Sequence, residues 1–143
     1  MRTILVHLRD AHEKDVADYL NHTYPVQPGP PWILDAAGDA VLFINFYRDL
    51  GTEYSDEDMT ALVKFLGREP KISVSVDISG RHKGNQEIRA FVCGLLSEFQ
   101  GVAQDEYTNH FWTMEEIANG FRVKGNSFFS YKNLEENGPQ YNN

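Results

Sequence analysis

The stretch KISVSVDI, residues 71–78, alternates polar and apolar side chains without a break. Successive side chains of a strand point to opposite faces of a sheet, so this alternation places its isoleucines and valines together on one face. The serine and aspartate side chains fall on the other face. The stretch therefore predicts a β-strand with one face in the core and one face in water.

The segment after this strand predicts a long helix. From Gln86 to Phe99 the apolar residues recur at spacings of three and four, which is typical of a helix with one apolar face. We expect Gly101 to end the helix and residues 102–104 to form a short strand. Cys93 lies in the middle of the helix, where a thiol usually packs as a small apolar group.

The N-terminal segment predicts a strand followed by a helix. Residues 2–9 place isoleucine, valine and leucine on one face at a period of two. Asp10 stands where an N-cap is expected, and Glu13 can complete a capping box, so a helix should run to about Asn21. The prolines within residues 24–31 prevent its continuation, because proline lacks the backbone N–H.

The middle of the chain predicts a hairpin and a second helix. Residues 32–35 and 40–47 form two apolar runs separated by a short turn, which favours two paired strands. Ser55 is a good N-cap for a helix over residues 56–66. Gly67 supplies the left-handed conformation that commonly ends a helix.

The resulting order of elements, β-α-β-β-α-β, matches the ferredoxin-like split βαβ pattern, in which helices cover one face of the sheet. The long helix and short strand extend it. Thr113 and Glu116 form a capping box before a helix at 114–118, and residues 121–131 predict a terminal hairpin. We therefore predict an α+β fold, with a single domain over residues 1–134 and a polar tail at 135–143.

Composition limits the classes of function. The chain has 143 residues, 41% of them hydrophobic, and a formal net charge of −8, which disfavours binding to nucleic acid. No apolar run is long enough to cross a membrane.

The single cysteine excludes an internal disulfide, and the N-terminus lacks a signal-peptide pattern, so we expect a cytoplasmic protein. No glycine-rich phosphate loop occurs, and no cofactor is predicted.

Two polar loops, residues 77–85 and 104–112, follow strands of the predicted sheet. If the long helix joins two parallel strands, both loops lie at the same edge of the sheet and their titratable side chains can converge. Carboxylates and imidazoles together suit a divalent metal or acid–base chemistry. The residues concerned are Asp77, His82, Asp105, Glu106 and His110.

A structural interpretation of the same loops is favoured over a metal or catalytic site. No spacing typical of zinc ligands fixes two of these residues on one helix face. Side chains such as Asp77, Asp105 and Asn109 commonly hold turns through bonds to the backbone. We therefore predict neither a metal ligand nor a catalytic residue here. His7, opposite the apolar face of the first strand, is expected to be partly exposed.

Charged clusters suggest contacts with a partner. An acidic run without an intervening basic residue would steer a basic partner toward one edge, although part of it complements a helix dipole. Its members are Asp49, Glu53, Asp56, Glu57 and Asp58. The only close basic cluster, residues 81–83, suits a phosphate or a carboxylate of a partner, or is a solvated turn. Aromatic residues are frequent in the C-terminal half, where core and protein-binding roles both remain open.

Three segments carry a resemblance to a known family. SGRHKG (residues 79–84), EIRAFV (87–92) and GVAQDEYTNHFWT (101–113) resemble an uncharacterised family of small bacterial cytosolic proteins. The resemblance covers Val76 to Ile117 and implies no catalytic residue. Proteins of this size and acidity also resemble the immunity proteins that accompany secreted bacterial toxins, which implies binding to another protein.

These patterns together favour a non-enzymatic protein-binding domain, most specifically an immunity-type protein that blocks a basic toxin domain. The alternative is a small metal-dependent or acid–base hydrolase built on the five loop residues, and self-association as a homodimer is a third reading. The residues expected to contact a partner are Asp49, Glu53, Asp56, Glu57, Asp58, Arg81, His82, Asp105, Glu106 and His110.

Overall fold

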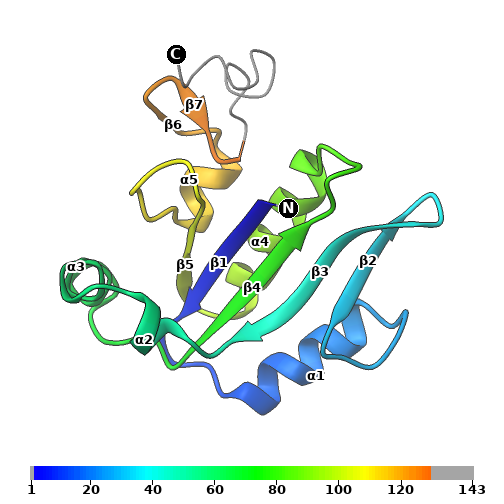
Figure 1. The fold of residues 1–143 in the computed structure, drawn as a ribbon, viewed down its shortest axis with the longest axis horizontal. Coiled ribbons are helices and arrows are strands. Elements are labelled where there is room, and N and C mark those ends of the chain that lie inside the picture. Colours follow the sequence, from blue (N-terminus) through cyan, green and yellow to red (C-terminus); the bar gives the residue numbers. More distant parts are fainter. Residues whose placement is uncertain (1, 130–143) are drawn as a thin grey trace.

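The computed structural model describes residues 2–129 and has a five-stranded sheet at its centre (Figure 1). Every neighbouring pair of strands is antiparallel, and the strand order is β2-β3-β4-β1-β5. The alternating stretch of residues 71–78 supplies the middle strand, β4. The strands are β1 (Arg2–Leu8), β2 (Trp32–Ala36), β3 (Asp39–Tyr47), β4 (Ile72–Ile78) and β5 (Gly101–Gln104).

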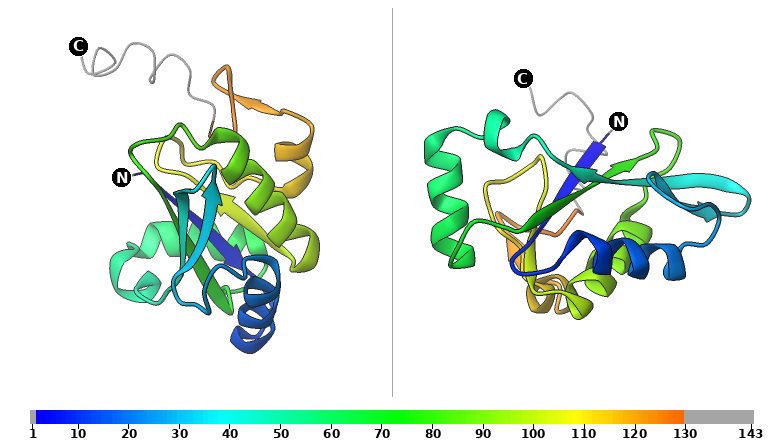
Figure 2. Two further views of the ribbon diagram at one scale, coloured as in Figure 1. Left: turned by 90° about the vertical axis from the view of Figure 1, so that its right-hand side faces the viewer. Right: turned by 90° about the horizontal axis from the view of Figure 1, so that it is seen from below.

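The helices divide between the two sides of the sheet (Figure 2). Helices α1 (Glu13–Thr23) and α4 (Asn85–Glu98) cover one face. Helices α2 (Leu50–Glu53) and α3 (Asp56–Leu66) lie beside β5 toward the other face. After β5 follow α5 and the small hairpin of two strands, namely α5 (Met114–Ala118), β6 (Arg122–Val123) and β7 (Asn126–Ser127).

The main core lies between the sheet and the layer of α1 and α4. The predicted apolar faces of β1 and β4 are confirmed, because their inward residues are fully buried apart from Ile72, which is partly buried at the start of β4. Cross-strand pairs such as Ile4 with Val76 align these residues in rows. The helices cover them with Val16 and Leu20 of α1, and with Ile88, Phe91, Val92, Leu95 and Leu96 of α4.

The predicted α+β class is confirmed, whereas the arrangement of the sheet differs from the expected order of pairing. The first six predicted elements would place β1 between β3 and β4, but β4 lies between β3 and β1. Strands β1 and β3 are parallel and are connected through α1 and β2, whereas β4 and β5 are parallel and directly flank α4. Strand β2 is added outside β3, and α2 with α3 is inserted before β4.

Helix α3 does not join the α1–α4 layer because its apolar residues pack elsewhere. Leu62 and Leu66 form a separate cluster with Val102, a residue of β5 whose neighbour on β1 is His7. That cluster lies on the face away from the main core. The helix therefore braces the edge of the sheet beside β5 and does not lie on the face covered by α1, as the second helix of the predicted β-α-β-β-α-β pattern would.

Several predicted helix ends are confirmed. The hydroxyl of Ser55 accepts the Asp58 N–H at the start of α3, and Gly67 has the left-handed conformation at its end. The capping box of Thr113 and Glu116 is formed. The predicted hairpin appears as β6 and β7, while Ser130, Tyr131 and the tail at 135–143 lie outside the described residues.

Two predicted helix ends are wrong. Helix α1 begins two residues later than expected, with His12 at the N-cap, and the Asp10 carboxylate bonds Arg68 at 2.9 Å instead. Gly101 does not end α4, which stops at Glu98. It starts β5, where a β-carbon would lie 2.2 Å from the carbonyl oxygen of His7, so glycine permits close approach of two strands.

Within the described part of the chain, no helix combines the length and the apolar character needed to cross a bilayer.

Candidate functional site

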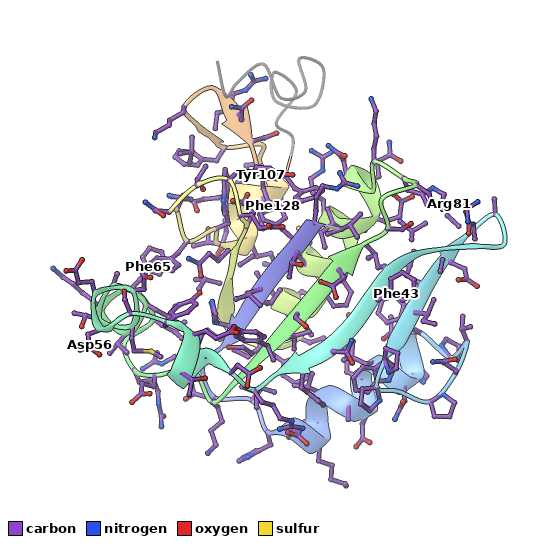
Figure 3. All side chains as sticks on the ribbon, viewed as in Figure 1. Phe43, Asp56, Phe65, Arg81, Tyr107 and Phe128 are labelled. Carbon is purple, nitrogen blue, oxygen red and sulfur yellow. The ribbon has the colours of Figure 1, made fainter. Side chains whose placement is uncertain are left out.

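The sheet face opposite α1 and α4 carries polar side chains, and the helices of residues 2–129 cover it only beside β5. The polar residues of β4 point to this face, in register with Thr3, Leu5 and His7 of β1. On the other side of β4, Phe43 pairs with Asp77 (Figure 3). Figure 2 shows α2 and α3 overhanging one end of this face, on the side opposite α1 and α4. A polar, half-covered sheet face is a surface that can receive another molecule.

A pocket of about 460 Å³ lies on this face between α2 and the chain that follows β5. Strand β1 contributes two residues to its lining, and the carboxylates come from both sides. We call it the acidic pocket, because no Lys or Arg is among the described residues that line it. These residues are Thr3, Leu5, Tyr47, Glu53, Tyr54, Gln104, Asp105 and Glu106.

Two carboxylates of the acidic pocket are held in place by hydrogen bonds. The Tyr47 hydroxyl donates to Oε1 of Glu53, and the backbone N–H of Thr3 donates to Oε1 of Glu106. Neither carboxylate forms an ion pair with a Lys or Arg of residues 2–129. Thr3 also donates from Oγ1 to Asp77 at 2.7 Å, so it connects β4 to the pocket. Within the described residues, the pocket thus holds two hydrogen-bonded carboxylates that have no Lys or Arg partner.

A buried polar network forms the wall behind the pocket. His7 is fully buried, with Nδ1 at 2.8 Å from Oγ of Ser73 and Nε2 at 3.1 Å from Oε1 of Gln104. The Tyr54 hydroxyl lies 3.2 Å from the same Nε2 and donates to Gln104. A neutral ring protonated on Nε2 satisfies every one of these contacts, because Nδ1 then accepts from Ser73.

Burial sets the protonation states in this network. Loss of hydration lowers the pKa of His7 to about 4, although the bond to Gln104 acts in the opposite direction. Burial raises the pKa of Tyr54 to about 12, and the nearby Asp58 charge adds to the effect. Both side chains are therefore uncharged at neutral pH, and nothing in this wall repels a cation in the pocket.

The Ser73–His7 contact resembles a nucleophile and its base, but its surroundings argue against catalysis. Ser73 is only 4% exposed, and Nε2 of His7 is enclosed by Gln104 and Tyr54. An imidazole with so low a pKa is also a weak base at neutral pH. The network instead fastens the end of α2 to the sheet. The expected partial exposure of His7 is wrong, because this end of α2 covers the strand.

The predicted acidic run lies along α2 and the start of α3. Its members are all exposed. Among them Glu53 lines the acidic pocket together with Asp105 and Glu106, which the sequence analysis placed in a separate loop. Two of the predicted partner-binding clusters therefore meet at one pocket. Asp49, Asp56, Glu57 and Asp58 form the adjoining acidic edge.

The predicted basic residues lie elsewhere. Nε2 of His82 is 3.0 Å from Oδ2 of Asp39, and a terminal nitrogen of Arg81 is 3.6 Å from the same oxygen. These contacts attach the loop after β4 to the β2–β3 hairpin. Figure 3 shows Arg81 beside this hairpin, on the opposite side of the molecule from Asp56 on α3. Arg81 and His82 do not share a surface with the acidic pocket.

Of the remaining loop residues, Asp105 holds its own turn, as the structural interpretation predicted, whereas Asp77 lies within β4 and accepts a bond from Thr3 of β1. Oδ1 of Asp105 accepts the N–H groups of Tyr107 and Thr108, each at 3.1 Å. Nε2 of His110 is 2.9 Å from Oε1 of Glu116, the residue of the capping box. Within residues 2–129, no group of three or more histidine, cysteine or acidic side chains is arranged to hold a metal ion.

Several residues of the site were missed in the sequence analysis. Tyr54 adjoins the acidic run and gave a usable signal, because an aromatic residue among carboxylates is typical of binding surfaces. Thr3, Tyr47 and Gln104 gave no signal, since their places in the pocket depend on strand pairing.

No protein-family model, curated protein or solved structure matches the chain. The family resemblance of residues 76–117 therefore stays a prediction.

Proposed function

We propose that this chain is a protein-binding domain that uses the acidic pocket and the adjoining acidic edge to bind a basic surface of another protein. One observation carries the proposal. Glu53 and Glu106 accept hydrogen bonds at an open pocket between α2 and the chain after β5, and they form no ion pair with a Lys or Arg of the described residues. A partner that supplies Lys or Arg side chains would form ion pairs with both carboxylates.

The more specific form of the proposal is an immunity-type protein whose partner is a bacterial toxin with a basic cleft. Its support is the net charge of −8 and the gathering of exposed carboxylates around α2. An acidic protein that fills a basic cleft competes directly with an anionic substrate of the toxin. Inhibition then requires occupation of the cleft and no chemistry.

The fold that we propose for this function is a decorated ferredoxin-like split βαβ. Support comes from the directions of four strands. Strands β1 and β3 run parallel on either side of β4, and β4 and β5 run parallel on either side of β1. The connection within each of these two sets contains a long helix. On this interpretation β2 and the α2–α3 segment are additions. Both helices of the core then cover one face, which leaves the opposite face free for a partner.

Binding would combine long-range charge and local packing. The exposed carboxylates of the acidic edge raise the rate of encounter with a basic partner. Affinity then depends on a few groups that become buried, and tyrosines commonly take this role at interfaces. Tyr47 and Tyr54 line the acidic pocket and have hydroxyls that are already bonded.

The test uses the full chain and the basic proteins encoded beside its own gene. Each is purified and its binding is measured by biolayer interferometry, and its effect on bacterial growth is measured with and without co-expression of the chain. We expect one such protein to bind, to arrest growth when expressed alone and to be neutralised by the chain. The proposal fails if none binds, or if Glu53→Gln with Glu106→Gln leaves both binding and protection unchanged.

A further inference from the structure

We propose that residues 50–66, which we call the flap, open away from the sheet as one unit while the main core stays folded. The flap comprises α2 and α3 and lies between β3 and β4 in sequence. Its Tyr54 contacts the buried His7, and Glu53 and Tyr54 line the acidic pocket. Opening would therefore expose the polar network behind the pocket and remove one of its walls.

The apolar contacts of the flap are separate from the main core. The buried residues of the flap are Leu62 and Leu66, and both belong to a small cluster that shares no residue with the core cluster. The members of this small cluster outside the flap are Val102 of β5 and Phe111. Helix α1 differs, because its buried residues belong to the core cluster itself. Few apolar contacts thus fasten the flap, and such regions open at a low free-energy cost.

Water can replace the polar contacts that the flap makes with the sheet. The Tyr54 hydroxyl lies 3.2 Å from Nε2 of His7 and donates to Gln104. Within residues 2–129, no residue of the flap forms an ion pair. When the flap opens, His7 and Gln104 keep their mutual contact at 3.1 Å and gain water, so neither is left buried without a partner.

Both ends of the flap contact the chain at the start of α1. Arg48, before the flap, bonds Glu13 at 2.8 Å, and Arg68, after it, bonds Asp10 at 2.9 Å. A hollow of about 320 Å³ lies between the base of the flap and the adjoining ends of β3 and β4. Figure 2 shows the flap at one end of the sheet, apart from the layer of α1 and α4. Attached ends and loose packing at the base allow the segment between them to rotate as one body.

Native-state hydrogen exchange of the full chain tests this inference. The chain is labelled with ¹⁵N, and amide exchange is followed by two-dimensional NMR at several urea concentrations below the unfolding transition. We expect the amides of α3 to share one opening equilibrium, at least about 100-fold more favourable than the opening of amides in β1, β4 and α4. Its dependence on urea should be weaker, because opening of the flap exposes less surface than unfolding of the chain does. Equal protection and equal urea dependence in α3 and β4, or protection that falls gradually from the middle of α3 to its ends, would overturn the inference.

Two matched substitutions show whether the flap and the core open separately. Leu95→Ala removes the same atoms from the main core as Leu62→Ala removes from the small cluster, and both leucines are fully buried. The main core is intact whether the flap is closed or open. Leu95→Ala should therefore change exchange of the α3 amides less than about twofold, while it raises exchange in β4 about thirtyfold or more. Leu62→Ala should raise exchange of the α3 amides by a similar factor.

A milder substitution covers the case in which Leu95→Ala does not fold. Ile88→Val removes one methyl group from the same core and should raise exchange in β4 about fivefold, with less than about twofold change in α3. If either core substitution accelerates exchange in α3 and β4 equally, the flap opens only when the whole chain unfolds and the inference is wrong. The measurement uses the chain alone, so its outcome does not depend on whether a binding partner is found.

Discussion

The hydroxyl of Tyr54 lies 3.2 Å from Nε2 of His7, and the two rings meet edge to face with their centroids 5.9 Å apart. This contact joins the residue after α2 to an interior strand of the sheet. It places Glu53, the preceding residue, at the mouth of the acidic pocket. The orientation of a surface carboxylate thus depends on a buried polar group.

Removing the Tyr54 hydroxyl should have a modest effect on stability. In Tyr54→Phe, Gln104 and His7 keep their mutual contact at 3.1 Å, so neither is left without a partner. We expect the free energy of unfolding in urea to fall by about 1 kcal/mol. The control is Tyr47→Phe, whose hydroxyl bonds the exposed Glu53 and whose loss should change stability by less than about 0.5 kcal/mol. Equal losses of free energy in the two variants would show that the Tyr54 hydroxyl contributes no more to stability than the Tyr47 hydroxyl does.

The low pKa of His7 predicts a loss of stability in mild acid. The unfolded chain binds a proton at this residue below about pH 6.5, whereas the folded chain binds it only near pH 4. Protonation therefore favours the unfolded state between these values, and the free energy of unfolding falls as the pH is lowered through this window. The full difference corresponds to about 3 kcal/mol. Urea unfolding at several pH values from 7.5 to 4 measures it.

The control for this pH dependence is His7→Asn, which cannot titrate. Its free energy of unfolding at pH 7.5 should be lower than that of the natural chain, because the contacts with Ser73 and Gln104 are disturbed. Its dependence on pH between 6.5 and 4 should nevertheless be weaker. Parallel curves for the two proteins would show that other groups cause the loss.

Close approach of β1 and β5 predicts that Gly101 is intolerant of substitution. In Gly101→Ala the new methyl group would lie 2.2 Å from a backbone oxygen of His7, so the two strands must separate. We expect a loss of about 2 kcal/mol in the free energy of unfolding. Gly51→Ala is the matched control, since a β-carbon there meets nothing within 4 Å. A thermal melt that ranks the two variants equally would contradict this reading of β5.

Local features of this fold could be predicted from the sequence, because they depend on neighbours along the chain. The alternation of β4 and the caps at Ser55, Gly67 and Thr113 are examples. The position of β4 between β3 and β1 could not be predicted, because alternation fixes a face and leaves the pairing partners open. The mistaken pairing followed from counting α3 as the second helix of the β-α-β-β-α-β pattern.

The site was predictable only in part for the same reason. Exposed acidic residues on α2 and after β5 were identified as candidates for contact with a partner. Their meeting in one pocket depends on where α2 lies against the sheet, and this four-residue helix has no strong sequence signal. The burial of His7 follows from the same contact. The sequence therefore supplied the charges of the site, and tertiary packing supplied its shape.

The acidic edge and the acidic pocket should act on different rate constants for binding to a basic partner. Replacing the charges of the edge, with Asp56→Asn, Glu57→Gln and Asp58→Asn together, weakens long-range attraction. We expect association at low salt to slow by about tenfold, with little change in dissociation. Glu53→Gln with Glu106→Gln removes contacts within the complex and should mainly speed dissociation, by about tenfold or more.

Stopped-flow measurements over a range of salt concentrations separate these effects. The natural chain should lose association rate as salt rises, and the edge variant should show a shallower dependence because fewer charges contribute to steering. Since the edge charges also stabilise the start of α3, the urea stability of this variant must be measured alongside. If the edge and pocket variants alter the same rate constant to the same degree, the carboxylates act as one diffuse charge and the pocket has no separate role.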